Sequence, residues 1–143
     1  MEHMNRSELR NIIMTILYQI NVYNKSKMIY DIEEVIKENL DIDNEFVKNV
    51  VYGVTTYQNE IDGLANTYLN NWTIDRLGNT DIAILRMGIY ELMYTDTPDI
   101  VCINEAIELA KKYSDDDVVK MINAVLDKVY HKKVDNEWKI SNS

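Results

Sequence analysis

The scarcity of residues that interrupt helices is the strongest constraint on how this chain folds. Its 143 residues include four glycines and one proline. We find no stretch in which apolar and polar side chains alternate between turn signals, as they do in an amphipathic strand. Because glycine and proline are the residues least compatible with a helix interior, long segments without them favour helices. The sequence therefore predicts an all-α fold.

Apolar side chains recur three and four residues apart along most of the chain, which is the spacing of one helix face. This spacing predicts about seven helices. Their expected ranges are about 5–22, 27–39, 43–54, 61–69, 79–93, 99–114 and 115–132, with a short helical turn at 75–77. Asp43 is expected to cap the third helix, and Asn79 or Thr80 the fifth, because short polar side chains accept hydrogen bonds from first-turn amides.

The length of the chain suits a single domain. A chain of 143 residues can bury a sizeable core without disulfides or metal, and the one cysteine, Cys102, cannot form an internal disulfide. The helical spacing fades after Lys132, so we predict one helical domain over 1–132 and a flexible tail over 133–143. There is no basic-then-apolar leader and no apolar run near the length of a membrane span, which predicts a cytoplasmic protein without membrane contact.

The net charge of −9 argues against a polyanionic partner, because affinity for nucleic acid comes from lysine and arginine. Its distribution weakens that argument. Residues 1–30 carry four basic and two acidic side chains, residues 31–70 carry two and nine, and residues 71–143 carry nine and thirteen. Since the acidic residues are concentrated in one internal block, a local basic face remains compatible with the composition.

Residues suited to catalysis or metal binding are few. The two histidines, His3 and His131, fall near the ends of the helical region, and with one cysteine they cannot supply a zinc site. Glu105 and Glu108 lie one helical turn apart, as in half of a carboxylate metal site, but no Glu-x-x-His pattern accompanies them. We therefore expect no metal and no other cofactor, and a carboxylate-bridged metal enzyme is the remote alternative.

Charged and amide side chains interrupt the apolar pattern in two neighbouring predicted helices. Arg86 and Glu91 lie in the first, and Asn104, Glu105 and Glu108 in the second. Polar groups near a core cost desolvation free energy unless they are paired. One interpretation of Arg86 is a buried guanidinium held by Glu91, Glu105 or Glu108, which would tie the two helices together. The other is direct contact with a ligand.

The first predicted helix has features of a nucleic-acid contact. Arg6 and Arg10 lie one turn apart and are expected on its outer side. The chain has ten tyrosines and one phenylalanine, and most of the tyrosines are expected to pack between helices. Tyr18 is the exception, because it lies towards the end of the arginine-bearing helix, where an aromatic ring could stack on an unpaired RNA base.

A series of motifs in chain order gives the chain a resemblance to a known family. The series comprises LYQ in the first helix, W-x-x-x-RL, D-x-AILR-x-x-x-YEL, a DTP turn, INEAIELAKKYS and N-x-VLDK. From about Met4 to Lys132 the chain resembles the NusB family of bacterial transcription antitermination factors. The resemblance implies a non-enzymatic protein built from two small helical bundles packed across one another.

The resemblance also implies partners. Members of the family pair with the ribosomal protein NusE, and the two together bind the boxA element of nascent RNA. The complex helps RNA polymerase to read through terminators, notably on ribosomal RNA operons. We therefore expect boxA RNA, NusE and the RNA polymerase antitermination complex as partners of this chain.

Site residues follow from the same resemblance. The implied RNA contacts are Arg6, Arg10, Tyr18, Lys120 and Met121. Asp81 stands where an acidic residue helps to engage NusE. The family's first helix is usually rich in arginine, whereas this chain has Ser7 and Glu8 there, so RNA affinity is expected to be weaker. The polar residues of the later helices are then expected to be structural, namely Arg86, Glu91, Asn104, Glu105 and Glu108.

Two alternatives stay open at the level of sequence. The net charge and the reduced arginine content also fit a helical protein-interaction module with little independent RNA binding. A homodimer is also possible, since the long apolar stripe of the first helix could pair with a second copy.

Overall fold

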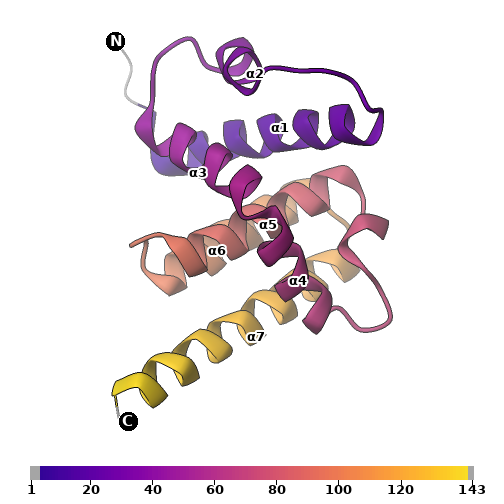
Figure 1. Ribbon diagram of the computed structural model, residues 1–143. Helices are drawn as coiled ribbons and strands as arrows, with labels where there is room; N and C mark the ends of the chain where they lie inside the picture. The colour runs from indigo at the N-terminus through magenta and orange to yellow at the C-terminus, as the bar shows by residue number, and fades with distance from the viewer. Residues whose placement is uncertain (1–3, 142–143) are drawn as a thin grey trace.

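The computed structural model describes residues 4–141, which form seven α-helices and one short 3-10 helix without any strand (Figure 1). The elements are α1 (Arg6–Lys25), α2 (Ile32–Asn39), α3 (Glu45–Thr56), α4 (Gln58–Tyr68), η1 (Ile74–Arg76), α5 (Asn79–Tyr94), α6 (Asp99–Tyr113) and α7 (Asp116–Ser141). The prediction of an all-α fold with about seven helices is confirmed. No helix within this range is both long and apolar enough to cross a membrane.

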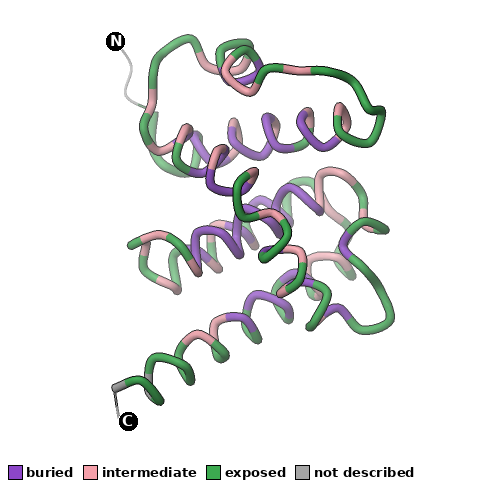
Figure 2. Tube along the Cα trace, in the orientation of Figure 1, coloured by how far each residue is buried: buried purple, intermediate pink, exposed green. Residues whose placement is uncertain are grey.

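Helix α5 is the centre of the packing. It contacts α1 and α3 on one side and α4, α6 and α7 on the other. Helices α1 to α3 gather at one end of the molecule and α4 to α7 at the other, as Figure 1 shows. Every residue of α5 from Ile82 to Leu92 is buried, whereas the other helices expose one face (Figure 2). A helix that is buried on all sides can serve both bundles as a shared core.

Side-chain caps define where several helices begin, and the cap of α3 differs from the predicted one. Asn5 caps α1 in a reciprocal arrangement with Glu8. The cap of α3 is Asn44, whose side-chain oxygen accepts a hydrogen bond from the Val47 amide at 3.0 Å. The prediction of Asp43 as this cap is wrong, because Asp43 forms an ion pair with Lys48 instead.

The start of α5 differs from its prediction for a similar reason. Gly78 is its cap residue and supplies no side-chain hydrogen bond. Neither Asn79 nor Thr80 acts as the predicted cap, since both are already helical. The side-chain oxygen of Asn79 instead accepts hydrogen bonds from Asn21 at 2.7 Å and Lys25 at 2.8 Å. The amide therefore joins α1 to α5.

Three helix boundaries were misplaced by the apolar spacing. Helix α1 continues to Lys25, and Lys27 then adopts a left-handed conformation (φ 56°), so α2 begins only at Ile32. Helix α7 continues to Ser141, beyond the end predicted at Lys132. The flexibility of residues 133–143 stays a prediction.

A glycine allows a tyrosine to lie close to the backbone of α3. A Cβ atom built on Gly53 would lie 2.1 Å from the ring of Tyr90. The hydroxyl of Tyr90 donates a hydrogen bond to the side-chain oxygen of Asn49 at 2.9 Å, and its ring stacks on Tyr94 at 5.4 Å. Gly63 in α4 has no atom within 4 Å of its own hypothetical Cβ. These two glycines therefore have different structural requirements.

Replacing each glycine by alanine tests this difference. Gly53→Ala is expected to lower the free energy of unfolding by about 1–3 kcal/mol, because the ring of Tyr90 must leave its place. Gly63→Ala is expected to raise it by about 0.5–1 kcal/mol, because alanine is the better helix former. Urea unfolding followed by circular dichroism measures the free energy of unfolding of both variants. Equal stabilisation by the two substitutions would show that the ring of Tyr90 can move without a cost in stability.

Candidate nucleic-acid interface

Arg10 is buried inside the protein rather than presented on the outer side of α1. Its side chain is 3% exposed, and its guanidinium donates two hydrogen bonds to the Glu91 carboxylate of α5, at 2.9 and 2.8 Å. The prediction that Arg10 lies on the outer face is therefore wrong. The physical reason is its position in the helix, where it follows Leu9 and precedes Ile13 on the face that packs into the core.

The surroundings of Arg10 stabilise its positive charge. The Glu105 carboxylate of α6 lies 3.9 Å from the guanidinium, so two carboxylates face it. Burial opposes the charge, but the hydrogen bond and the charge of Glu91, with that of Glu105, outweigh it and raise the pKa of Arg10. Arg10 is therefore a permanently charged link between α1, α5 and α6.

Ser7 and Glu8, which stand where the family resemblance implies arginine, have structural partners. The hydroxyl of Ser7 donates hydrogen bonds to the Glu105 carboxylate at 2.8 and 3.0 Å. Glu8 completes the capping arrangement of α1, with its amide donating to the Asn5 side chain at 2.8 Å. These positions thus contribute to the packing and capping of α1.

Arg86 is also buried, with a partner that the sequence did not indicate. Its guanidinium donates two hydrogen bonds of 2.9 Å to the Asp62 carboxylate of α4 and one of 3.3 Å to the Asn21 side chain of α1. The interpretation of Arg86 as a buried, carboxylate-bound group is correct. The proposed partners Glu91, Glu105 and Glu108 are not, because α5 turns this side chain towards α4.

Arg6 remains exposed and is held by an aromatic ring. Its guanidinium carbon lies 4.0 Å from the centre of the Phe46 ring of α3, and that of Arg10 lies 5.2 Å from the same ring. Phe46 is the only phenylalanine of the chain. Attraction between a cation and an aromatic face restricts the motion of Arg6 while its N–H groups stay free towards solvent. The sequence offered no signal for this contact except the rarity of phenylalanine.

A groove lies beside this arginine. It is lined by residues of α1, α3, α6 and the loop between α5 and α6, including Phe46, Asn49, Thr97 and Val101. Its charged residues are Arg6 and Arg10 on one hand and Glu45, Asp96 and Glu105 on the other. The groove therefore combines one exposed cation, Arg6, with carboxylate, amide, hydroxyl and apolar groups.

The remaining RNA-contact candidates lie on α1 and α7. Tyr18 is exposed on α1, with 41% of its surface accessible. Lys120 is exposed near the start of α7, and Met121 is half-buried beside it. Tyr18 and Lys120 line neither the groove beside Arg6 nor the pocket that contains Met121.

Asp81 shares an open pocket with Met121. The pocket has apolar walls from Trp72, Leu77, Val118 and Met121, and its polar residues include Asp81 and Asp117. Asp81 lies in the first turn of α5, where the helix dipole favours a negative charge, and it accepts a hydrogen bond from the hydroxyl of Ser114. The structure thus brings together the predicted partner contact and one predicted RNA contact.

The remaining polar and titratable residues that the sequence singled out lie on α6 and α7, apart from His3. Asn104 and Glu108 are exposed on α6, and Glu108 pairs with Lys111 at 3.5 Å. His131 lies 3.5 Å from Asp127 on α7, and His3 falls outside the described residues. Burial raises the pKa of the Cys102 thiol to about 12, which keeps it protonated at neutral pH. Within residues 4–141 no group of acidic, histidine or cysteine side chains is arranged to hold a metal.

The chain is similar over most of its length to proteins of one family. Residues 7–131 match the sequence profile of the NusB family. The transcription antitermination protein NusB of Macrococcus caseolyticus is 39% identical over 132 residues, which cover 91% of this chain and 99% of that protein. The solved structure of T. maritima NusB has a TM-score of 0.80 at 29% identity, covering 91% of this chain and 93% of that chain.

A further solved structure contains partners. Its title describes the antitermination factors NusB and NusE in complex with dsRNA. It has a TM-score of 0.76 at 26% identity, and the similarity covers 89% of this chain and 96% of that chain.

Mutation of the Arg10–Glu91 pair tests its structural role. Glu91→Gln is expected to lower the free energy of unfolding by about 3–5 kcal/mol, because it leaves the Arg10 charge buried without its main partner. The double variant Arg10→Met and Glu91→Leu is expected to lose less than Glu91→Gln, since neither charge then remains. Urea unfolding measures the free energy of unfolding of the wild type, Glu91→Gln and the double variant. Glu108→Gln, which breaks an exposed pair, is the control and should change stability by less than about 0.5 kcal/mol.

Proposed function

Because this chain belongs to the NusB family of transcription antitermination proteins, we propose that it binds the boxA element of nascent ribosomal transcripts together with the ribosomal protein NusE. In this role it joins the antitermination complex of RNA polymerase in the cytoplasm. The solved relative in complex with NusE and dsRNA supports both kinds of partner.

The single observation that carries the RNA-binding proposal is the exposed Arg6 guanidinium on the face of Phe46. An arginine held in this way loses less conformational entropy when it binds a phosphate, and its planar fork matches phosphate oxygens. The groove beside it supplies amide and hydroxyl groups for further contacts, whereas the carboxylates of Glu45, Asp96 and Glu105 oppose phosphate there. Tyr18, Lys120 and Met121 extend the proposed RNA surface along α1 and α7.

The burial of Arg10 limits how strongly the protein alone attracts RNA. Its guanidinium is engaged by Glu91 and faces Glu105, so its charge is largely neutralised locally. Each phosphate contact that is missing weakens the electrostatic part of binding. This observation favours the second candidate, a module whose RNA binding depends on NusE, and a comparison with and without NusE separates the two.

We place the NusE contact at the pocket of Asp81. Apolar surface from Trp72, which is 53% exposed, and from Val118 can be buried by a partner side chain. Asp81 and Asp117 provide two negative charges in the pocket against the one positive charge of Arg76, and this excess suits a basic group of the partner. Ribosomal proteins bind RNA through basic groups, so such a complement is chemically reasonable.

Substitution of Arg6 tests the RNA surface. Arg6→Ala is expected to reduce the affinity for a labelled boxA RNA about tenfold, because one charge-assisted contact is lost. The slope of log affinity against log salt concentration should fall by about 0.7. Fluorescence anisotropy at several salt concentrations, with and without NusE, measures both quantities.

The matched control is Lys37→Ala, which removes one exposed positive charge on α2. It should leave affinity and salt slope almost unchanged. Absence of saturable RNA binding by the folded wild-type protein, both alone and with NusE, would reject the proposal. Binding only in the presence of NusE would favour the second candidate.

Substitution of Asp81 tests the NusE surface. Asp81→Asn keeps the shape of the side chain and an oxygen that can accept from Ser114, but it removes the charge. The affinity for NusE is expected to fall about five- to tenfold in isothermal titration calorimetry at low salt. Asp41→Asn, in the exposed loop before α3, loses the same charge and serves as the control. If Asp81→Asn and Asp41→Asn bind NusE with equal affinity, NusE does not contact the pocket of Asp81.

A further inference from the structure

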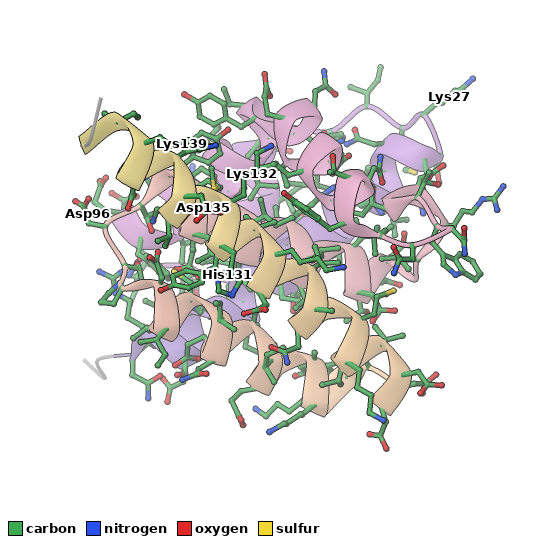
Figure 3. All side chains as sticks on the ribbon, turned by 90° about the horizontal axis from the view of Figure 1, so that it is seen from below. Lys27, Asp96, His131, Lys132, Asp135 and Lys139 are labelled. Carbon is green, nitrogen blue, oxygen red and sulfur yellow. The ribbon has the colours of Figure 1, made fainter. Side chains whose placement is uncertain are left out.

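Lysines gather along one exposed side of α7, outside the surfaces described above. Lys128, Lys132 and Lys139, which we call the α7 stripe, line a shallow groove together with Tyr68 of α4. Figure 3 shows His131, Lys132, Asp135 and Lys139 along the same helix, viewed from below. The groove also contains Asn136.

Helix geometry explains why these lysines share one side. With 3.6 residues per turn, positions separated by four, seven and eleven residues fall within about 40° of each other around the helix axis. The opposite side of α7 buries apolar side chains in the core, among them Ile122, Val125, Leu126 and Val129. The stripe therefore cannot turn inward. It extends about 17 Å along the axis, at 1.5 Å per residue.

The three ammonium groups keep their charges free. Within residues 4–141 no carboxylate forms an ion pair with Lys128, Lys132 or Lys139. The neighbouring Lys133 differs, because it contacts the Asp99 carboxylate at 2.7 Å and the Leu92 carbonyl oxygen at 2.8 Å. That lysine attaches α7 to the start of α6, whereas the stripe lysines have no comparable structural contact.

The negative groups near the stripe reduce its charge without cancelling it. Asp135 lies in the groove itself, between Lys132 and Lys139 in sequence. Asp127 is engaged by His131 at 3.5 Å. Three lysines against one carboxylate leave the groove positive, in a chain whose overall net charge is −9. A positive surface on an acidic protein marks where a polyanion can approach.

We propose that the α7 stripe and Tyr68 form a second RNA contact, which binds the single-stranded RNA that flanks the boxA segment. This inference rests on the proposed function. The lysines would neutralise phosphates without reading sequence, and the half-buried ring of Tyr68 would offer a surface for base stacking. An aromatic ring beside a row of cations can bind both the bases and the phosphates of single-stranded RNA. An acidic protein surface would use only the cations, so RNA is the better match for this site.

The position of the stripe connects it to the proposed RNA surface. Lys120 lies on the same helix, eight residues before Lys128 and about 80° from it around the helix axis. From Lys120 to Lys139 the helix covers about 29 Å. RNA that leaves the first surface near Lys120 therefore finds further cations along α7.

The test compares a short and a long RNA. The short RNA contains boxA alone, and the long ones carry about ten additional uridines at the 5′ or the 3′ end, within the range of lengths that single-strand sites bind. The variant Lys128→Gln plus Lys132→Gln removes two stripe charges. Its affinity for one of the long RNAs should fall severalfold in fluorescence anisotropy with NusE present, and its salt slope should fall by about 1.4. Its affinity for the short RNA should stay as in the wild type.

The matched control is Lys27→Gln plus Lys37→Gln, which removes two exposed charges from the opposite part of the molecule. Glutamine and lysine have similar helix propensities at Lys37 of α2, Lys27 lies outside the helices, and circular dichroism checks that the double variants fold. If the wild-type protein binds the short RNA, the inference is overturned when both double variants lose equal affinity for the long RNA, or when neither loses any. Failure of the wild-type protein to bind even the short RNA would instead reject the proposed function, and with it this inference.

Discussion

Two charged side chains are buried in α5, and each needs a partner of opposite charge. The rest of the structure depends on how these two charges are paired. Helix α5 is buried from Ile82 to Leu92, yet it contains Arg86 and Glu91. A charge inside a core costs several kcal/mol unless an opposite charge with good hydrogen-bond geometry faces it. Glu91 is satisfied by Arg10 of α1, and Arg86 by Asp62 of α4. Apolar packing holds the helices together without choosing one register, whereas these two pairs specify how α1 and α4 lie against the central helix.

The same constraint shapes the proposed functional surface. Because Arg10 is needed inside, Arg6 is the arginine of α1 that stays available to solvent, and Phe46 holds it there. The acidic block between residues 31 and 70 lies in α2, α3, α4 and the loops before α2 and α3, whereas the stripe lysines lie on α7. An acidic protein can thus present separate positive regions. Function in this fold depends on the local placement of charge more than on its total.

Much of the architecture could be predicted from the sequence. The spacing of apolar residues identified the helices, since burial of one face is a local property that repeats with the helical turn. Boundaries were less predictable. Asn44 rather than Asp43 caps α3, and Lys27 ends α1 with a left-handed residue. Such choices depend on which competing hydrogen bond or ion pair is available nearby, and in the case of Asp43 the competitor was Lys48.

The sequence by itself determined the helical class, the family and the small set of polar residues that had to be explained. It also offered burial beside a carboxylate as one of two interpretations of Arg86, because an arginine between apolar neighbours needs a partner if it is buried. Only the tertiary structure decided which charges meet. Arg10 and Glu91 are separated by 81 positions, and Arg86 and Asp62 by 24. Periodicity describes which face of a helix turns inward, but the partner across the interface is set by how the helices pack against each other.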